Sequence, residues 1–185
     1  MRVVGIAGSL RRDSHNLRLL RAAAGALPPE ADFEVWEGLA TLPPYDADAD
    51  GPDGHPAVAR LRRALRDGDA VLFATPEYNG SIPGVLKNAL DWASRPFPDN
   101  ALRGKPAAVV GASTGLFGAV WAQAELRKVL STIGARVIDE ELPVGLVDEA
   151  FASGDRLRDP ELEGKLAEIV GSLAREAAGA LEPVA

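Results

Sequence analysis

The sequence predicts a doubly wound α/β domain, in which helices cover both faces of a parallel β-sheet. Short apolar runs bounded by glycine or proline alternate along the chain with segments whose apolar residues recur at helical spacing. The run 105–113 is nearly continuous in apolar residues, as expected of a parallel strand that is covered on both faces. No internal repeat or linker divides the sequence, so we expect residues 1–185 to form one domain.

The beginning of the chain contains two predicted strands and one predicted helix. Residues 2–7 are apolar and rich in β-branched side chains, which indicates a strand. Apolar residues recur at helical spacing from Leu17 onward and predict a helix, which Pro28 stops. Residues 33–36 predict a short second strand. The polar segment 38–56 has no periodicity, and we expect it to be a long loop.

The remaining elements continue the alternation of strand and helix. In chain order they are a helix marked by Val58, Leu61 and Leu65, a strand at 69–75, a helix at about 83–94, a strand at 105–113, a helix from Ala122 to Ile133, a strand at 136–138 and a helix marked by Leu162, Leu166, Ile169, Val170 and Leu173. The alanine-rich segment from Ala174 is expected to be the fraying end of this last helix. The total is five strands and five helices.

Three loops that follow predicted strands are rich in glycine and in small hydroxyl or amide side chains. They span residues 8–16, 76–84 and 113–118. In a parallel sheet the carboxyl ends of the strands meet at one edge, and open α/β sheets bind their ligands there. We therefore expect the three loops to form one binding site.

The loop 8–16 combines serines, an arginine pair and the beginning of a helix. Free backbone N–H groups and the helix dipole favour a phosphate there, and Arg11 adds positive charge. A simpler interpretation is that Ser14 only caps the helix while the arginines are solvated. The loop matches neither G-x-G-x-x-G nor a Walker sequence, which disfavours Rossmann-type NAD binding and P-loop chemistry and indicates a mononucleotide.

The loop 76–84 offers backbone amides, a proline, an aromatic ring and an amide side chain. Asn79 and Gly80 permit backbone conformations with positive φ. Such groups suit a planar heterocycle, whose edge needs hydrogen bonds and whose face needs an apolar neighbour. The alternative is a plain strand-to-helix connection in which Tyr78 is half-buried.

The segment 111–115 matches the G-x-S-x-G sequence of the nucleophile elbow, which raises the hypothesis of a serine hydrolase. In α/β-hydrolases the acid and the histidine follow the serine in the chain. Here both histidines, His15 and His55, precede Ser113. The sequence therefore disfavours a hydrolase.

Composition excludes several other classes of protein. The chain contains no cysteine and only two histidines, which excludes disulfides, thiolate nucleophiles and cysteine- or histidine-rich metal sites. The net charge of −7 argues against nucleic acid as a partner, although residues 1–27 carry five arginines and one aspartate. No apolar run approaches the ~20 residues that span a bilayer, and we expect a cytoplasmic protein without membrane contact.

Three blocks of the sequence resemble the NAD(P)H-dependent FMN reductase family, whose members include quinone, azo-dye and chromate reductases. The blocks are GSLR at 8–11 with Ser14 and Asn16, PEYNGSIPG at 76–84 followed by LKNALDW at 86–92, and the segment 104–115 with AQ at 122–123 and LR at 126–127. The second block is the most specific. The resemblance implies a flavodoxin-like fold with the strand order 2-1-3-4-5.

The resemblance also implies FMN as the cofactor and NADPH or NADH as the co-substrate. The FMN-binding residues that it implies are Ser9, Leu10, Arg11, Ser14, His15 and Asn16 at the phosphate, and Pro76, Glu77, Tyr78, Asn79, Ser113 and Gly115 at the isoalloxazine ring. Flavin N5 carries the hydride, so no catalytic side chain and no metal are expected. NAD(P)H and a small-molecule acceptor, such as FMN, a quinone, an azo compound or chromate, react in turn in a ping-pong cycle.

A homodimer or homotetramer is expected by the same resemblance, and the apolar helix 83–92 supports it. The three tryptophans are expected in core or subunit packing, and Trp92 and Trp121 could lie at a dimer interface. Two other functions stay open at this point. One is a flavodoxin-type electron carrier, although carriers tend to display acidic residues around the flavin; the other is an α/β domain without a flavin.

Overall fold

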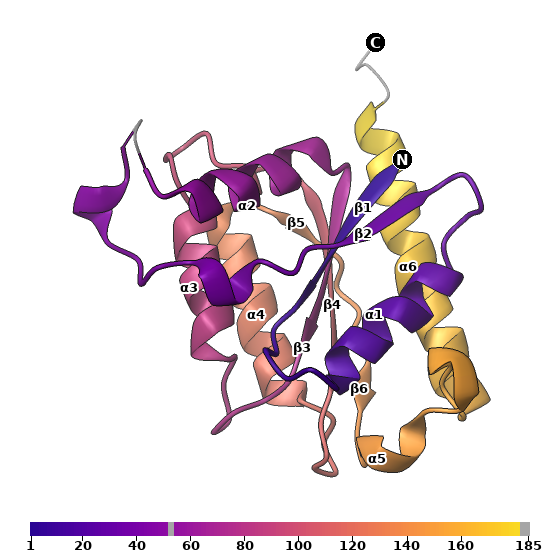
Figure 1. The fold of residues 1–185 in the computed structure, drawn as a ribbon. Coiled ribbons are helices and arrows are strands. Elements are labelled where there is room, and N and C mark those ends of the chain that lie inside the picture. Colours follow the sequence, from indigo (N-terminus) through magenta and orange to yellow (C-terminus); the bar gives the residue numbers. More distant parts are fainter. Residues whose placement is uncertain (52–53, 182–185) are drawn as a thin grey trace.

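The computed structural model describes residues 1–51 and 54–181 and contains a parallel sheet (Figure 1). Its strand order, β2-β1-β3-β4-β5, confirms the predicted flavodoxin-like topology. The strands are β1 (Arg2–Ala7), β2 (Asp32–Val35), β3 (Ala70–Thr75), β4 (Pro106–Ala112), β5 (Arg136–Val137) and β6 (Pro143–Val144). Every pairing within this sheet is parallel, so the carboxyl ends of its strands share one edge.

The helices also lie close to where the sequence predicts them. They are α1 (His15–Gly25), α2 (Pro56–Asp67), α3 (Gly84–Ala93), α4 (Val120–Ile133), α5 (Val147–Ala150) and α6 (Pro160–Leu181), and short 3-10 turns occupy Leu39–Thr41, Ala47–Ala49 and Ser153–Asp155. The short α5 was not predicted. The alanine-rich end of the chain is helical as far as Leu181, and the predicted tail beyond it lies outside the described residues. No described helix is both long and apolar enough to cross a membrane.

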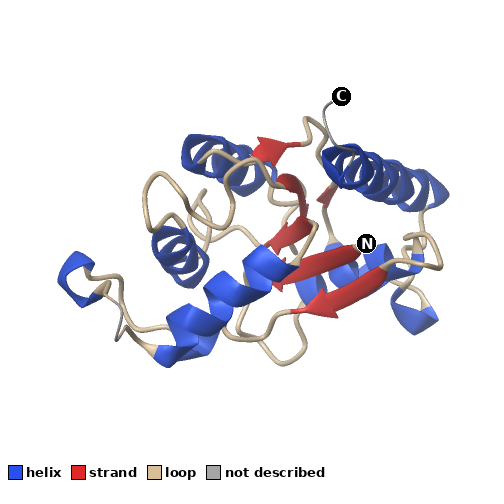
Figure 2. Cartoon of the chain, turned by 90° about the horizontal axis from the view of Figure 1, so that it is seen from above, coloured by secondary structure: helices blue, strands red, loops and turns tan. Residues whose placement is uncertain are grey.

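Helices cover both faces of the sheet, and each face has its own hydrophobic cluster (Figures 1 and 2). Helices α2, α3 and α4 pack on one face, while α1 and α6 pack on the other. Strand β3 contributes side chains to both clusters, because Val71 and Phe73 point to the first face and Leu72 points to the second. All six residues of β3 are buried, which explains why this strand lacks an alternating polar pattern.

Trp92 is 1% exposed and belongs to the core, so the suggestion that it lies at a dimer interface is wrong. Its indole contacts Tyr45 edge-on at 4.9 Å, and its Nε1–H donates to Pro43 O at 2.9 Å. Asn88 of the same helix donates to Pro43 O as well. Helix α3 therefore buries its apolar stripe and fixes part of the long 38–56 loop.

The predicted fifth strand is divided into two short strands that pair with the same neighbour. β5 pairs with the start of β4, and β6 pairs with its end. Between them, the acidic residues 139–141 leave the sheet, and the ladder resumes where Gly111 N–H donates to Leu142 O at 3.1 Å. The buried side chain of Gln123 supports this break, because it accepts from Leu142 N–H and donates to Gly118 O, both at 3.1 Å.

Candidate functional site

The loops after β1, β3 and β4 meet at the carboxyl edge of the sheet around a cavity of about 90 Å³. It is lined by Ser9, Arg11, Ser14, His15, Asn16, Pro76, Glu77, Tyr78, Ala112, Ser113 and Thr114. Nine of these were expected from the sequence, whereas Ala112 and Thr114 were not. The other expected residues, Leu10, Asn79 and Gly115, belong to the same loops but do not line this cavity.

The first loop presents the beginning of α1 to this cavity. Ser14 caps the helix, because its Oγ accepts from Leu17 N–H at 3.3 Å. No described residue accepts a hydrogen bond from the N–H groups of His15 and Asn16, which begin the helix. Arg11 is exposed and forms no ion pair within residues 1–51 and 54–181. These free donors and the nearby guanidinium form a site for an anion.

Asn16 joins the first loop to the end of β4. Its Nδ2 donates to Ala112 O at 2.9 Å, and its Oδ1 accepts from Ala112 N–H at 3.0 Å. The side chain is buried, so both bonds are shielded from water. Asn16 was expected to contact a phosphate through its side chain, but the structure shows that its amide mainly holds two loops together.

His15 and Arg18 connect α1 to the segment that contains α5. The His15 Nε2 atom lies 3.3 Å from Asp148 Oδ1, and the imidazole stacks on Phe151. The Arg18 guanidinium lies 4.4 Å from the centre of the Phe151 ring and donates to Asp155 at 2.8 Å. Nothing in the local sequence pattern indicated these contacts, which join residues more than 100 positions apart.

The second loop contains a tight turn at Asn79 and Gly80. Both have positive φ, 55° and 75°, which these two residue types permit. Tyr78 and Ser81 exchange backbone hydrogen bonds of 3.0 and 3.2 Å across the turn. The N–H groups of Asn79 and Gly80 donate to no described residue. The tip of the turn thus offers two free donors beside the exposed ring of Tyr78.

Two carboxylates fix the second loop against α4. Glu77 Oε2 accepts from the N–H groups of Trp121 and Ala122, each at 3.1 Å, and so caps the first turn of this helix. In the opposite direction, Ile82 N–H donates to Glu125 Oε2 at 3.3 Å. The Glu77 carboxylate is therefore engaged in structure, and it is not placed as a free general base.

The third loop approaches the segment after β6 closely. Gly118 has a φ of 57°, and a Cβ there would lie 2.4 Å from the Pro143 carbonyl carbon. Ser113 Oγ accepts from Gly115 N–H at 3.1 Å, and neither histidine forms a hydrogen bond with this serine. The geometry therefore provides no catalytic triad for a serine hydrolase.

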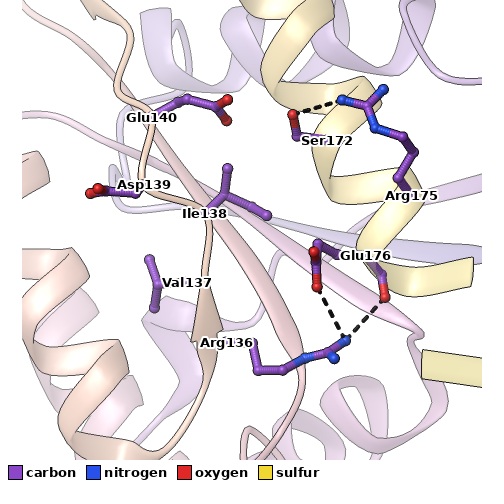
Figure 3. Close-up of a pocket in the computed structure, with 8 residues that line it drawn as sticks. All are labelled: Arg136, Val137, Ile138, Asp139, Glu140, Ser172, Arg175 and Glu176. Atoms are coloured by element: carbon purple, nitrogen blue, oxygen red, sulfur yellow. Dashed lines mark hydrogen bonds and ion pairs between the residues drawn. The ribbon is translucent and has the colours of Figure 1, made fainter. Parts of the chain in front are cut away.

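A larger cavity of about 480 Å³ lies away from these loops, between β5 and α6 (Figure 3). None of the expected site residues lines it. Its arginines are already bonded, because Arg136 Nη2 contacts Glu176 and Arg175 Nη2 donates to Ser172 Oγ at 3.0 Å. Convergence of free donors therefore identifies the candidate site better than cavity size does.

A sequence profile of the NADPH-dependent FMN reductases matches residues 1–148. The chain belongs to this family. The matched region contains all three loops of the candidate site. An NAD(P)H-dependent FMN reductase of Pseudomonas aeruginosa is 44% identical over 160 residues, which covers 86% of this chain and 85% of that protein.

Another curated relative and a solved structure are also named as reductases or oxidoreductases, and the solved structure has a similar fold. A 2-hydroxy-1,4-benzoquinone reductase from Burkholderia is 45% identical over 130 residues, or 70% of this chain and 69% of that protein. The flavoenzyme FerB, an NAD(P)H:acceptor oxidoreductase of Paracoccus denitrificans, superposes with a TM-score of 0.82 at 36% identity and covers 96% of this chain and 97% of its own. This FMN reductase family member is thus an oxidoreductase that depends on FMN and NAD(P)H, as the sequence predicted.

The Asn16 contact can be tested by replacing Asn16 with aspartate. The carboxylate can accept from Ala112 N–H but cannot donate to Ala112 O, and a charge is buried in addition. We expect the free energy of unfolding to fall by about 2–4 kcal/mol, measured by urea denaturation of the flavin-free protein. The exposed Asn79→Asp variant is the control and should change it by less than about 0.5 kcal/mol. Equal stability of the two variants would show that the Asn16 contact is unimportant.

Proposed function

We propose that the chain binds FMN across the three loops, with the phosphate in the 90 Å³ cavity at the beginning of α1. The observation that carries this proposal is that the N–H groups of His15 and Asn16 and the guanidinium of Arg11 have no partner among the described residues. The cavity is smaller than the roughly 300–1,000 Å³ of typical small-molecule sites, which suits a phosphate group better than a flavin ring. The ring then lies outside it, over the loops after β3 and β4.

The residues divide into three groups in this proposal. Those at the phosphate are Ser9, Leu10, Arg11, Ser14, His15 and Asn16; those at the ring are Pro76, Glu77, Tyr78 and Asn79; and those in the loop after β4 are Ser113 and Gly115. Asn16 contributes its backbone N–H, because its amide is engaged with Ala112. Glu77 likewise acts on the ring through its backbone, because its carboxylate is engaged in capping α4.

Bound FMN supplies a ring that accepts a hydride from NAD(P)H and passes the electrons to an acceptor. The protein contributes the positive charge of Arg11 and the α1 dipole, which hold the phosphate. The free N–H groups of Asn79 and Gly80 can stabilise negative charge at the ring edge. We infer a ping-pong cycle, in which NAD(P)H and the acceptor use the same open surface in turn.

Quinones are the acceptor class that the relatives support most directly. The Burkholderia relative is named for a hydroxybenzoquinone, and a relative in Escherichia coli, 39% identical over 141 residues, is named a quinone reductase. FMN, azo compounds and chromate remain further candidates from the family resemblance. A cytoplasmic location belongs to the same proposal, because it gives access to NAD(P)H.

The decisive experiment reduces the bound flavin anaerobically with NADPH or NADH and then offers each acceptor. We expect NADPH or NADH to bleach the flavin absorbance, which should then recover rapidly when a quinone is added. Parallel lines in double-reciprocal plots of initial velocity, with one substrate varied at several fixed concentrations of the other, would support the ping-pong cycle. A protein whose flavin is not reduced by either nucleotide would instead be an electron carrier, and a protein that takes up no FMN would contradict both functions.

The phosphate and ring assignments predict a loss of FMN affinity in two variants. Arg11→Ala removes the guanidinium beside the phosphate, and we expect the Kd for FMN to rise about 10- to 100-fold. Asn79→Ala keeps the backbone N–H but removes the amide side chain that we place at the ring, and it should raise the Kd several-fold. Fluorescence titration of the flavin-free protein measures both. Arg60→Ala, on the exposed surface of α2, is the matched control. Unchanged affinity in both site variants would refute the assignment.

We also propose that the protein forms a homodimer or homotetramer. The apolar stripe of α3 no longer supports this, since it faces the core. The support comes from exposed apolar side chains beside the ring surface, namely Leu116, Phe117, Trp121 and Leu146. Phe117 and Trp121 contact each other edge-on at 5.1 Å. A second copy that covers these residues would also shield the flavin from solvent.

The proposed interface predicts that Trp121→Glu lowers the molecular mass in solution. Trp121 is 53% exposed, so the substitution should not disturb folding. We expect light scattering after size-exclusion chromatography to show a monomer, while the wild-type protein shows two or four copies. Phe97→Ser is the control, because Phe97 is also exposed but lines a cavity with Ile133 at the other end of α4. A monomeric wild-type protein would contradict the proposal.

A further inference from the structure

A second cavity adjoins the phosphate loop on the side of β2 and has a volume of about 370 Å³. Ser9 and Arg11 line both this cavity and the smaller one. The other walls come from α1 and from the segment that follows β2. Its volume lies in the range of small-molecule sites, and the proposed FMN position does not fill it.

The cavity is lined by more positive than negative charge. Arg11 and Arg12 are exposed, and neither forms an ion pair within the described residues. Arg21 also lines the cavity, although its Nη1 lies 3.6 Å from Asp155. Glu37 is the acidic residue of the lining. Free guanidinium groups favour phosphate, which they bind through two parallel hydrogen bonds.

Another wall of the cavity is flat and apolar. Trp36 is half-buried, and a Cβ on Gly38 would lie 2.2 Å from its indole. The absence of a side chain at position 38 thus lets the indole lie directly over the backbone. Leu39, which is buried, and Leu10, which is exposed, add aliphatic surface. A planar heterocycle can pack against such a wall while its phosphate faces the arginines.

The position of the cavity relates it to the flavin surface. With the strand order β2-β1-β3-β4, the loops after these strands stand side by side at steps of about 5 Å. The cavity lies between the loops of β2 and β1, and the proposed ring surface covers the loops of β3 and β4. The cavity and the ring surface are therefore about 10–15 Å apart, a distance that an extended dinucleotide can bridge.

From the charge, the flat wall and the position, we propose that this cavity binds the adenosine 2′-phosphate portion of NADPH, and that Arg12 selects NADPH over NADH. The proposal rests on the proposed function, because it assumes that a nicotinamide nucleotide reduces the bound flavin. An arginine that faces the ribose 2′-phosphate is the usual basis of NADP preference in α/β enzymes, whereas an acid favours the free hydroxyl. Glu37 therefore disfavours the 2′-phosphate that Arg12 attracts, and the balance of these two charges sets the preference between NADPH and NADH.

Calorimetric titration of the FMN-loaded protein with adenosine 2′,5′-bisphosphate tests the cavity without any electron transfer. We expect this probe to bind at least 10-fold more tightly than adenosine 5′-monophosphate. Arg12→Ala should weaken it about 10-fold, whereas Glu37→Gln should strengthen it several-fold. Arg60→Ala, the exposed control on α2, should leave it unchanged. The proposal is overturned if the two probes bind equally or if Arg12→Ala binds the bisphosphate like wild type.

Steady-state kinetics separates this proposal from the proposed function. In Arg12→Ala the KM for NADPH should rise about 10-fold, while the KM for NADH and the FMN content stay unchanged. If NADH and NADPH reduce a quinone in wild type but Arg12→Ala raises neither KM, the reductase assignment stands and the role of Arg12 is wrong. If wild type oxidises neither nucleotide yet still binds the bisphosphate, the reductase assignment fails instead.

Discussion

The contact between Asn16 and Ala112 is the constraint on which the functional edge depends. Strand β3 separates β1 from β4 in the sheet, so no ladder hydrogen bond connects the loops that follow them. Asn16 makes this connection, because its amide exchanges two hydrogen bonds with the backbone of Ala112, one residue beyond the end of the β3 pairing. The same contact directs the beginning of α1 toward the third loop. The small cavity, which residues of both loops line, depends on that spacing.

Most of the fold could be predicted because its strands are buried on both faces and its helices are amphipathic. The predicted strand 69–75 begins one residue before β3, and the predicted strand 105–113 extends one residue beyond β4 at each end. The divided fifth strand was missed. β5 and β6 have two residues each, too few to show a period, and the break depends on Gln123, which is distant in sequence.

The candidate site was predictable as a set of loops but not as a set of contacts. Turn chemistry and strand ends indicated which segments meet, and nine expected residues line one cavity. What the side chains do there depends on partners far along the chain. Neither the bonds of Asn16 to β4 nor those of Glu77 to α4 can be inferred from local sequence. The burial of Trp92 is a similar case, because its partner Pro43 lies in a loop without periodicity.

The interruption of the fifth strand also affects how copies of the protein can associate. A long exposed edge strand invites pairing with the edge of another sheet and leads to aggregation. At the edge formed by β5 and β6, each strand has two residues, the intervening segment 138–142 contains three consecutive acidic residues, and a proline begins β6. This edge offers little continuous backbone to a second sheet. Extension of the sheet from this side is therefore disfavoured, and the four-residue strand β2 forms the opposite edge.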